Sequence, residues 1–315
     1  MRVAVASILA LLWAGHAAAT PFAWITNQAD NTVTVINTAT GKAEASIKVG
    51  HRPAGVVASH DGSRVYVSNP ESKDVSIIDG VARTVIKTLL VGDGPLGIAI
   101  SPDDQRVFIS DWYNHQVAVL DTASIEITSR IPVGNSPAGL AVTPDGTRLV
   151  VANRDDNTVS VINLADGKPL AIIAGGKAPF GVTLDAKGER AFVANVQSSD
   201  VSVIDLRSFQ VTQTLPVGSF PYAIAHEPVT DRLFVTNQHD NSVSVLDLNS
   251  GKTLKTLNIG DYPEGIALHP DGKHVYVVSW FDGAVYVIDT TTLEAGSPIK
   301  SGNGSRGFGD FIAPR

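Results

Sequence analysis

Residues 53–94 read PAGVVASHDGSRVYVSNPESKDVSIIDGVARTVIKTLLVGDG, and the pattern of this stretch returns every 42 residues. Runs rich in Val, Ile and Tyr alternate in it with Gly, Asp, Asn and Pro. Such runs fit pleated strands, and such punctuation fits turns. A period near 40 to 45 residues, made of four short strands, is typical of one blade of a β-propeller. Each unit opens on a proline: Pro53, Pro95, Pro137, Pro179, Pro221 and Pro263.

The quoted unit predicts four strands, separated by turn signals. Their expected bounds are Gly55 to Ser59, Arg64 to Ser68, Asp74 to Asp79 and Val85 to Val91. Two further positions keep the same phase in the other units. A small residue follows each proline by two positions: Gly55, Gly97, Gly139, Gly181, Ala223 and Gly265. A polar residue follows it by sixteen: Asn69, Asp111, Asn153, Asn195, Asn237 and Ser279.

The two ends of the chain complement each other. The unit that begins at Phe22 corresponds to a second strand and has no first strand before it, whereas Ser305 to Ile312 has the phase of a first strand. We therefore expect Ser305 to Ile312 to pair with Phe22 to Thr26 and close the ring. Counting 315 − 22 + 1 gives 294 residues, or 7 × 42. The sequence thus predicts an all-β, seven-bladed β-propeller with four-stranded blades of 42 residues and no unpaired seam.

Composition and the first residues indicate an exported protein. The apolar run at 3–13 and the small residues at 17–19 are typical of a secretory signal over residues 1–19, which leaves 20–315 as one propeller domain. The run is too short for a spanning helix, and no cysteine is present for a lipid anchor, a disulfide or a haem-attachment motif. We expect a periplasmic or secreted monomer without a membrane anchor. The net charge of −7, which becomes −8 without Arg2, disfavours a broad nucleic-acid-binding surface.

The ends of the second strands carry a recognisable motif. They read YVSN at 66–69, FISD at 108–111, VVAN at 150–153, FVAN at 192–195, FVTN at 234–237 and YVVS at 276–279. This pattern resembles the YVTN-repeat β-propeller family over essentially all of the mature chain. The resemblance implies a propeller fold but no single function. The family includes bacterial periplasmic propellers, some described as DNA-binding, archaeal surface-layer proteins and proteins encoded near quinoprotein alcohol-oxidation systems, while related propellers carry copper or haem in denitrification enzymes.

Polar residues that recur in nearly every unit are interpreted as structural. The Asn that ends each second strand, and the Asp that ends most third strands (Asp79, Asp121, Asp205, Asp247 and Asp289), can satisfy backbone groups of the turns beside them. Residues that break the repeat are better candidates for function. The most conspicuous are two aromatic pairs, Trp112-Tyr113 and Trp280-Phe281, which follow the exceptional positions Asp111 and Ser279.

The aromatic pairs fall in loops between second and third strands, which share one face of a propeller with the loops that lead into the inner strands. We expect them at the mouth of the central channel, where converging aromatic and charged residues mark a binding surface. The alternative is that each pair caps its own blade. The candidate ligand-binding residues are Trp112, Tyr113, Trp280, Phe281, Phe180, Tyr222, Tyr262, Arg52, Arg154, Arg306, His51, His115 and His239.

The histidines do not predict a metal centre. His51, His115 and His239 are expected on the aromatic face, His60, His269 and His274 near the opposite face, and His226 inside a blade. A copper centre needs several imidazoles at one point. We expect neither a metal nor another cofactor, and we find no nucleophile and base pair and no phosphate-binding glycine loop.

Three functions remain open at this point. The leading hypothesis is a non-catalytic periplasmic propeller that binds a protein partner or small ligand on its channel-mouth face, with an accessory role in a quinoprotein-type oxidation system implied by the resemblance. A second is nucleic-acid binding, in which the aromatic pairs stack on bases while Arg52, Arg154 and Arg306 contact phosphates. A third is a metal-assisted lyase or hydrolase.

Overall fold

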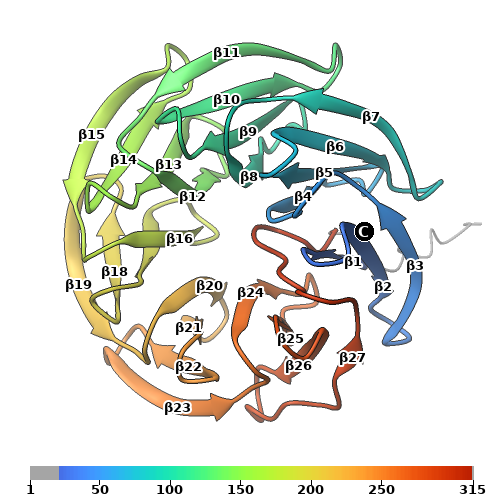
Figure 1. Cartoon of the computed structure of the whole chain (residues 1–315). Coiled ribbons are helices and arrows are strands. Elements are labelled where there is room, and N and C mark those ends of the chain that lie inside the picture. The colour runs from blue at the N-terminus through green and yellow to red at the C-terminus, as the bar shows by residue number, and fades with distance from the viewer. Residues whose placement is uncertain (1–20, 314–315) are drawn as a thin grey trace, which may run out of the picture.

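Seven antiparallel sheets stand around a central channel, as Figure 1 shows. The structure is a computed structural model that describes residues 21–313, so the signal predicted over residues 1–19 lies outside the described residues. The described part is built from strands and turns and holds no helix that is long and apolar enough to cross a membrane. The seven-bladed β-propeller predicted from the 42-residue repeat is confirmed.

Six blades run from an innermost strand at the channel to an outermost strand at the rim, whereas the first sheet holds three strands, with Ser305 and Ile312 bridged to the inner edge of its strand Phe22–Asn27. The innermost strands are β4 (Val56–Ala58), β8 (Pro95–Ile100), β12 (Pro137–Val142), β16 (Pro179–Leu184), β20 (Pro221–Glu227) and β24 (Pro263–Leu268). The second strands are β1 (Phe22–Asn27), β5 (Arg64–Asn69), β9 (Arg106–Asp111), β13 (Arg148–Asn153), β17 (Arg190–Asn195), β21 (Arg232–Asn237) and β25 (His274–Ser279). The third strands are β2 (Thr32–Asn37), β6 (Asp74–Asp79), β10 (Gln116–Asp121), β14 (Thr158–Asn163), β18 (Asp200–Asp205), β22 (Ser242–Asp247) and β26 (Ala284–Asp289). The outermost strands are β3 (Lys42–Lys48), β7 (Thr84–Leu90), β11 (Glu126–Pro132), β15 (Lys168–Ala174), β19 (Gln210–Pro216), β23 (Lys252–Asn258) and β27 (Ile299–Lys300).

The recurrent polar residues are structural: the Asp residues hold backbone groups of the turns, as predicted, whereas the Asn side chains donate mainly to side chains of the next strand. In β13, Asn153 is buried and its Nδ2 donates to the hydroxyls of Thr158 at 3.0 Å and Ser160 at 2.8 Å in the next strand. At the end of β6, Asp79 Oδ1 accepts hydrogen bonds from the backbone N–H groups of the following turn. Equivalent contacts recur around the ring, which leaves these residues occupied by their own blades.

Neighbouring blades are joined by a hydroxyl near the end of the second strand. Ser110 Oγ donates to the carbonyl of Ala138 in the next blade at 2.7 Å, and Thr26, Ser68 and Thr236 make the same contact to their own next blades. The blades approach so closely that a Cβ added at Gly97 would lie 2.1 Å from the Ala138 carbonyl oxygen. This close approach explains why a glycine recurs two positions after the proline.

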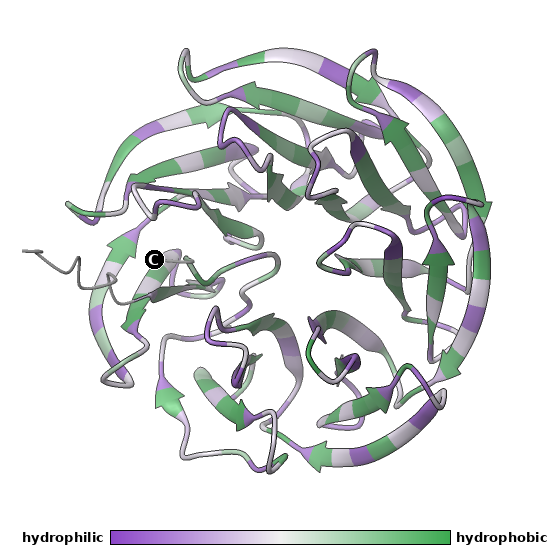
Figure 2. Ribbon diagram, turned by 180° about the vertical axis from the view of Figure 1, so that it is seen from behind, coloured by the Kyte–Doolittle hydropathy of each residue, from purple (hydrophilic) through white to green (hydrophobic). Residues whose placement is uncertain are grey.

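Apolar side chains fill the space between adjacent blades. The second and third strands are almost wholly buried, whereas most positions of the outermost strands are exposed to solvent. Figure 2 shows this contrast as green inner strands and a rim in which green and purple segments alternate. Packing of sheet against sheet therefore supplies the hydrophobic burial that stabilises the ring.

Ring closure follows the prediction at both ends of the closing segment, residues 305–313. Asn27 pairs with Ser305, and Ala23 pairs with Ile312, both antiparallel. Between these points the segment leaves β1 and lies beside β4, where Val56 N donates to the carbonyl of Phe308 at 2.9 Å. The expected regular first strand is therefore interrupted, because Ser305 to Ile312 holds more residues than the pairing with β1 can use.

Candidate functional site

The two aromatic pairs lie on the face predicted for them, here called the aromatic face. Trp112 N donates to the carbonyl of Gly94, and Trp280 N donates to that of Tyr262, so these loops sit beside the loops that lead into β8 and β24. Tyr113 and Phe281 point outward and expose 68% and 67% of their surface, whereas both tryptophans are half-buried. The second residue of each pair is therefore the solvent-exposed one.

Three buried rings from distant parts of the chain meet at the centre of this face, and we call them the ring plug. They are Phe180 of β16, Tyr222 of β20 and Phe308 of the closing segment, with centroid separations of 4.6 to 5.3 Å. Trp112 extends the group, its ring lying 6.4 Å from that of Phe180, with the Arg154 guanidinium 5.8 Å from its centre. Trp112 therefore packs on the plug in addition to covering its own blade.

A buried polar network lies beside the plug. Arg306 Nε donates to the Tyr222 hydroxyl at 2.9 Å and lies 3.0 Å from Glu264 Oε2, while Gln238 Nε2 donates to Glu264 Oε1 at 2.9 Å. Burial raises the pKa of Glu264 to about 7, although Arg306 and Gln238 act in the opposite direction. Burial lowers the pKa of Arg306, but the neighbouring Glu264 and Tyr222 raise it by more. The pKa of Arg306 therefore lies above its ordinary value. Arg306 is thus a structural cation tied to its neighbours.

A second group of rings runs along the aromatic face. The His239 ring stacks on Phe220 at 3.7 Å and lies 5.9 Å from Tyr262, which in turn meets Phe281 edge-on at 5.5 Å. Phe220 and Tyr262 have positive φ angles of 55° and 61°. Because the residues at this repeat position in several other blades share that conformation, it belongs to the repeated turn and does not by itself mark a site.

The remaining predicted residues do not join either group. Arg52 pairs with Glu71 at 2.9 Å near exposed His51, and His115 Nδ1 accepts a hydrogen bond from Ser136 N. Trp280 packs toward Gly304, whose added Cβ would lie 3.5 Å from it. That these residues bind a ligand stays a prediction.

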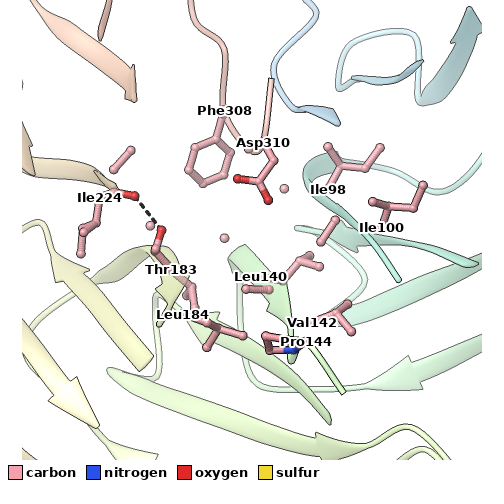
Figure 3. A pocket seen from close by; sticks show the side chains of 18 of the residues that line it. Ile98, Ile100, Leu140, Val142, Pro144, Thr183, Leu184, Ile224, Phe308 and Asp310 are labelled. Carbon is pink, nitrogen blue, oxygen red and sulfur yellow. Dashed lines mark hydrogen bonds between the residues drawn. The ribbon is translucent and has the colours of Figure 1, made fainter. Parts of the chain in front are cut away.

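Below the ring plug, the channel holds a cavity of about 390 Å³. Phe308 forms one end, and the cavity reaches exposed turns after β8, β12 and β16, on the face opposite the aromatic pairs. Its walls are mainly aliphatic side chains of the inner strands, as Figure 3 shows. The carboxyl group of Asp310 projects among them.

Sequence reasoning missed Phe308 and Asp310, although a signal was present. At the repeat position of Asp310, the other blades carry Ala58, Ile100, Val142, Leu184, His226 and Leu268. Asp310 is the one residue of these seven that has a carboxyl group, and glycines flank Phe308 on both sides. The principle used to select the aromatic pairs, that function lies where the repeat breaks, would also have selected this segment.

A histidine cluster occurs on the opposite face. His269, Asp271 and His274 place their ligand atoms within 4.8 Å of one another, beside a second cavity between the last blade and the first. The same groups also hold a turn: His269 Nδ1 accepts from Asp271 N, and Asp271 Oδ1 accepts from Lys273 N. In the turn after β12, Thr143 has the repeat position of His269, and its hydroxyl donates a hydrogen bond to Asp145. His269 therefore has a structural role in its own turn. The expected absence of a metal stays a prediction.

Comparison with known proteins identifies the family. Residues 82–262, more than half of the 315, match the family described as "Choice-of-anchor I domain". The chain belongs to this family. No curated protein sequence matches the chain. The YVTN-repeat resemblance stays a prediction beside this match.

Three solved structures share the fold. Kuenenia stuttgartiensis hydrazine synthase is 24% identical, with a TM-score of 0.79, over 86% of this chain and 92% of its own. A functionally unknown protein from Desulfotomaculum acetoxidans DSM 771 is 18% identical, with a TM-score of 0.79, over 90% and 98%. Dihydro-heme d1 dehydrogenase NirN in complex with DHE is 16% identical, with a TM-score of 0.69, over 91% and 74%. At these identities the likeness shows the fold, and function has to be argued from the site.

Proposed function

We propose that this chain is a non-catalytic, exported propeller that binds a protein partner on its aromatic face. The observation that carries the proposal is the exposure of Tyr113 and Phe281, large aromatic side chains that border two ordered groups of rings. Exposed aromatics on a rigid scaffold are typical anchors of protein interfaces because they bury much area and have few conformations to lose.

The ring plug favours a protein over a small ligand at this face. Phe180 and Tyr222 are buried against one another, so the channel mouth offers a surface and not an opening. The three arginines considered for phosphate binding are each paired with a carboxylate: Arg52 with Glu71, Arg154 with Asp155 and Arg306 with Glu264. This pairing, together with the net charge of −7, disfavours nucleic acid.

We place the protein in the periplasm or outside the cell, in an accessory role beside an oxidation system. The signal-like residues 1–19 and the YVTN-type strand ends support this location. One protein with this fold, dihydro-heme d1 dehydrogenase, is named for a redox reaction, which is compatible with a redox setting for this chain.

The proposal can be tested by photo-crosslinking of the full-length protein in its native host. A photoreactive phenylalanine at position 113 or 281 should give one discrete protein adduct. The same group at position 229 is the matched control, because Val229 is 85% exposed in the turn between β20 and β21, on the opposite face. With the adduct identified, Phe281→Ser should weaken its binding by about 1–3 kcal/mol, and Val229→Ser should not. Equal adducts from all three positions, or none from 113 and 281, would refute the proposal.

A further inference from the structure

The channel cavity is built for a different ligand from the aromatic face. Ile98, Leu140, Ile224 and Phe308 supply apolar walls, and the volume of about 390 Å³ falls within the range of small-molecule sites. The opposite face gives access, because the cavity reaches the exposed residues Pro102, Pro144 and Ala186 in the turns after the inner strands. A ligand could therefore enter without displacing the ring plug.

The closing segment places a carboxyl group inside this apolar space. Its backbone is fixed on both sides, by Val56 N donating to the Phe308 carbonyl and by Ala313 N donating to the Phe22 carbonyl. Gly309, with φ of 119°, turns the chain between them. The Asp310 side chain consequently points across the channel toward Leu140 and Thr183, as Figure 3 shows.

The Asp310 carboxyl group accepts no hydrogen bond and forms no ion pair within residues 21–313, unlike its polar neighbours. His60 pairs with Asp104 at 2.6 Å, Asp185 pairs with Arg190 at 2.9 Å, and Thr183 Oγ1 donates to the Ile224 carbonyl at 2.6 Å. Asp310 is exposed to the cavity, while the protein atoms of the surrounding ring desolvate its carboxyl group. This desolvation raises the pKa of Asp310, and His60 only partly opposes it.

An unpaired carboxylate in an apolar cavity selects its ligand by charge. A small organic cation would bring a charge-assisted hydrogen bond to Asp310 and an apolar body to the walls. An anion would be repelled. A hard metal ion would find one unpaired carboxylate, since Asp185 is paired with Arg190, where several oxygen ligands are needed.

We propose that the channel binds a small organic ammonium ion, with its nitrogen on Asp310 and its apolar part against Ile98, Leu140 and Ile224. This site is separate from the aromatic face and does not depend on the partner proposed there.

The test uses hexylamine and phenethylamine as probes, with hexanol and hexanoate as matched neutral and anionic molecules. Isothermal titration calorimetry at pH 7 should show one-to-one binding of both amines, at least about tenfold tighter than hexanol, because hydrogen bonds to charged groups are the stronger ones. Asp310→Asn should weaken amine binding by about tenfold or more and leave hexanol binding within about twofold.

A second pair of variants tests the location. Val142→Phe should reduce the binding of amine and alcohol alike, because Val142 lines the cavity. Leu268→Phe is the matched control, since Leu268 has the same repeat position in the seventh blade but lies outside the cavity lining. The proposal is overturned if neither amine binds, if amine and alcohol bind equally, or if Asp310→Asn or Val142→Phe leaves amine affinity unchanged.

Discussion

Glu264 and Asp310 are both carboxyl groups with raised pKa values, but their surroundings differ. Glu264 is buried, with Oε1 accepting a hydrogen bond from Gln238 and Oε2 forming an ion pair with Arg306. Asp310 faces a cavity and, among residues 21–313, has no such hydrogen-bond or ion-pair partner. Desolvation is the dominant cause of the shift in both residues, although Glu264 is buried and Asp310 is open to the cavity. Glu264 therefore contributes to the stability of the ring, whereas the carboxyl group of Asp310 is available to bind a ligand.

Glu264 should make folding stability depend on pH. Its pKa of about 7 in the folded protein lies above the ordinary value of 4.5, so the folded state holds a proton that the unfolded state releases between these pH values. Stability should fall as pH rises from about 4.5 to 7 and then level off, by up to about 3 kcal/mol. Urea denaturation of the wild type and of Glu264→Gln from pH 4.5 to 8 measures this.

The Glu264→Gln variant should lose this fall, whatever its absolute stability, because Gln does not titrate. Equal pH slopes in the two proteins would show that Glu264 is not the titrating group.

The closing segment is the element in which structure and repeat differ most. A regular inner strand would pair along all of β1, but here only the ends pair, and the residues between them cross to β4. Gly307 and Gly309, which both have positive φ angles, allow this path. At Gly309 an added Cβ would lie 2.7 Å from the Val56 carbonyl oxygen, and its φ of 119° is one that other residues rarely adopt.

Gly309→Ala should therefore cost about 1–3 kcal/mol of stability through backbone strain. Gly296→Ala is the matched control, because its nearest neighbour would lie at 3.8 Å and its φ is not in the left-handed region, so its effect should stay within about 0.5 kcal/mol. Urea denaturation of both variants gives the comparison. Equal stabilities would mean that the crossing path tolerates a side chain.

The ring as a whole depends on contacts that join its first and last parts. The closing segment bonds to β1, to β4 and, through the Arg306 carbonyl, to Gly265 N of β24. It also buries Phe308, Phe311 and Ile312. One short segment thus connects three blades.

Truncation after Gly304 should lower the melting temperature by about 10 °C or more. The lost apolar side chains contribute about 1.5–3 kcal/mol each when fully buried, and 1 kcal/mol corresponds to about 2–4 °C in a protein of this size class. The uncovered edge of β1 should also promote association. Differential scanning calorimetry and size-exclusion chromatography compare the truncated and full chains. A truncated monomer that melts like the parent would contradict this account of closure.

The blades could be predicted from the repeat. A 42-residue repeat of short β-type runs fixes strand number, strand order and the roles of Asn153 and Asp79, because these depend on local turn chemistry and on contacts that every blade repeats. It also placed the aromatic pairs on one face, since that follows from the position of a loop within the repeat.

The contents of the channel became clear only from the folded structure. That Trp112, Phe180, Tyr222 and Phe308 form one group, and that Asp310 stands in the cavity, depends on where blades far apart in sequence converge. A periodic pattern describes each blade and its neighbours. It does not describe the axis of the ring, where several blades meet. There the closing segment leaves β1, and the side chains of this segment enter the channel.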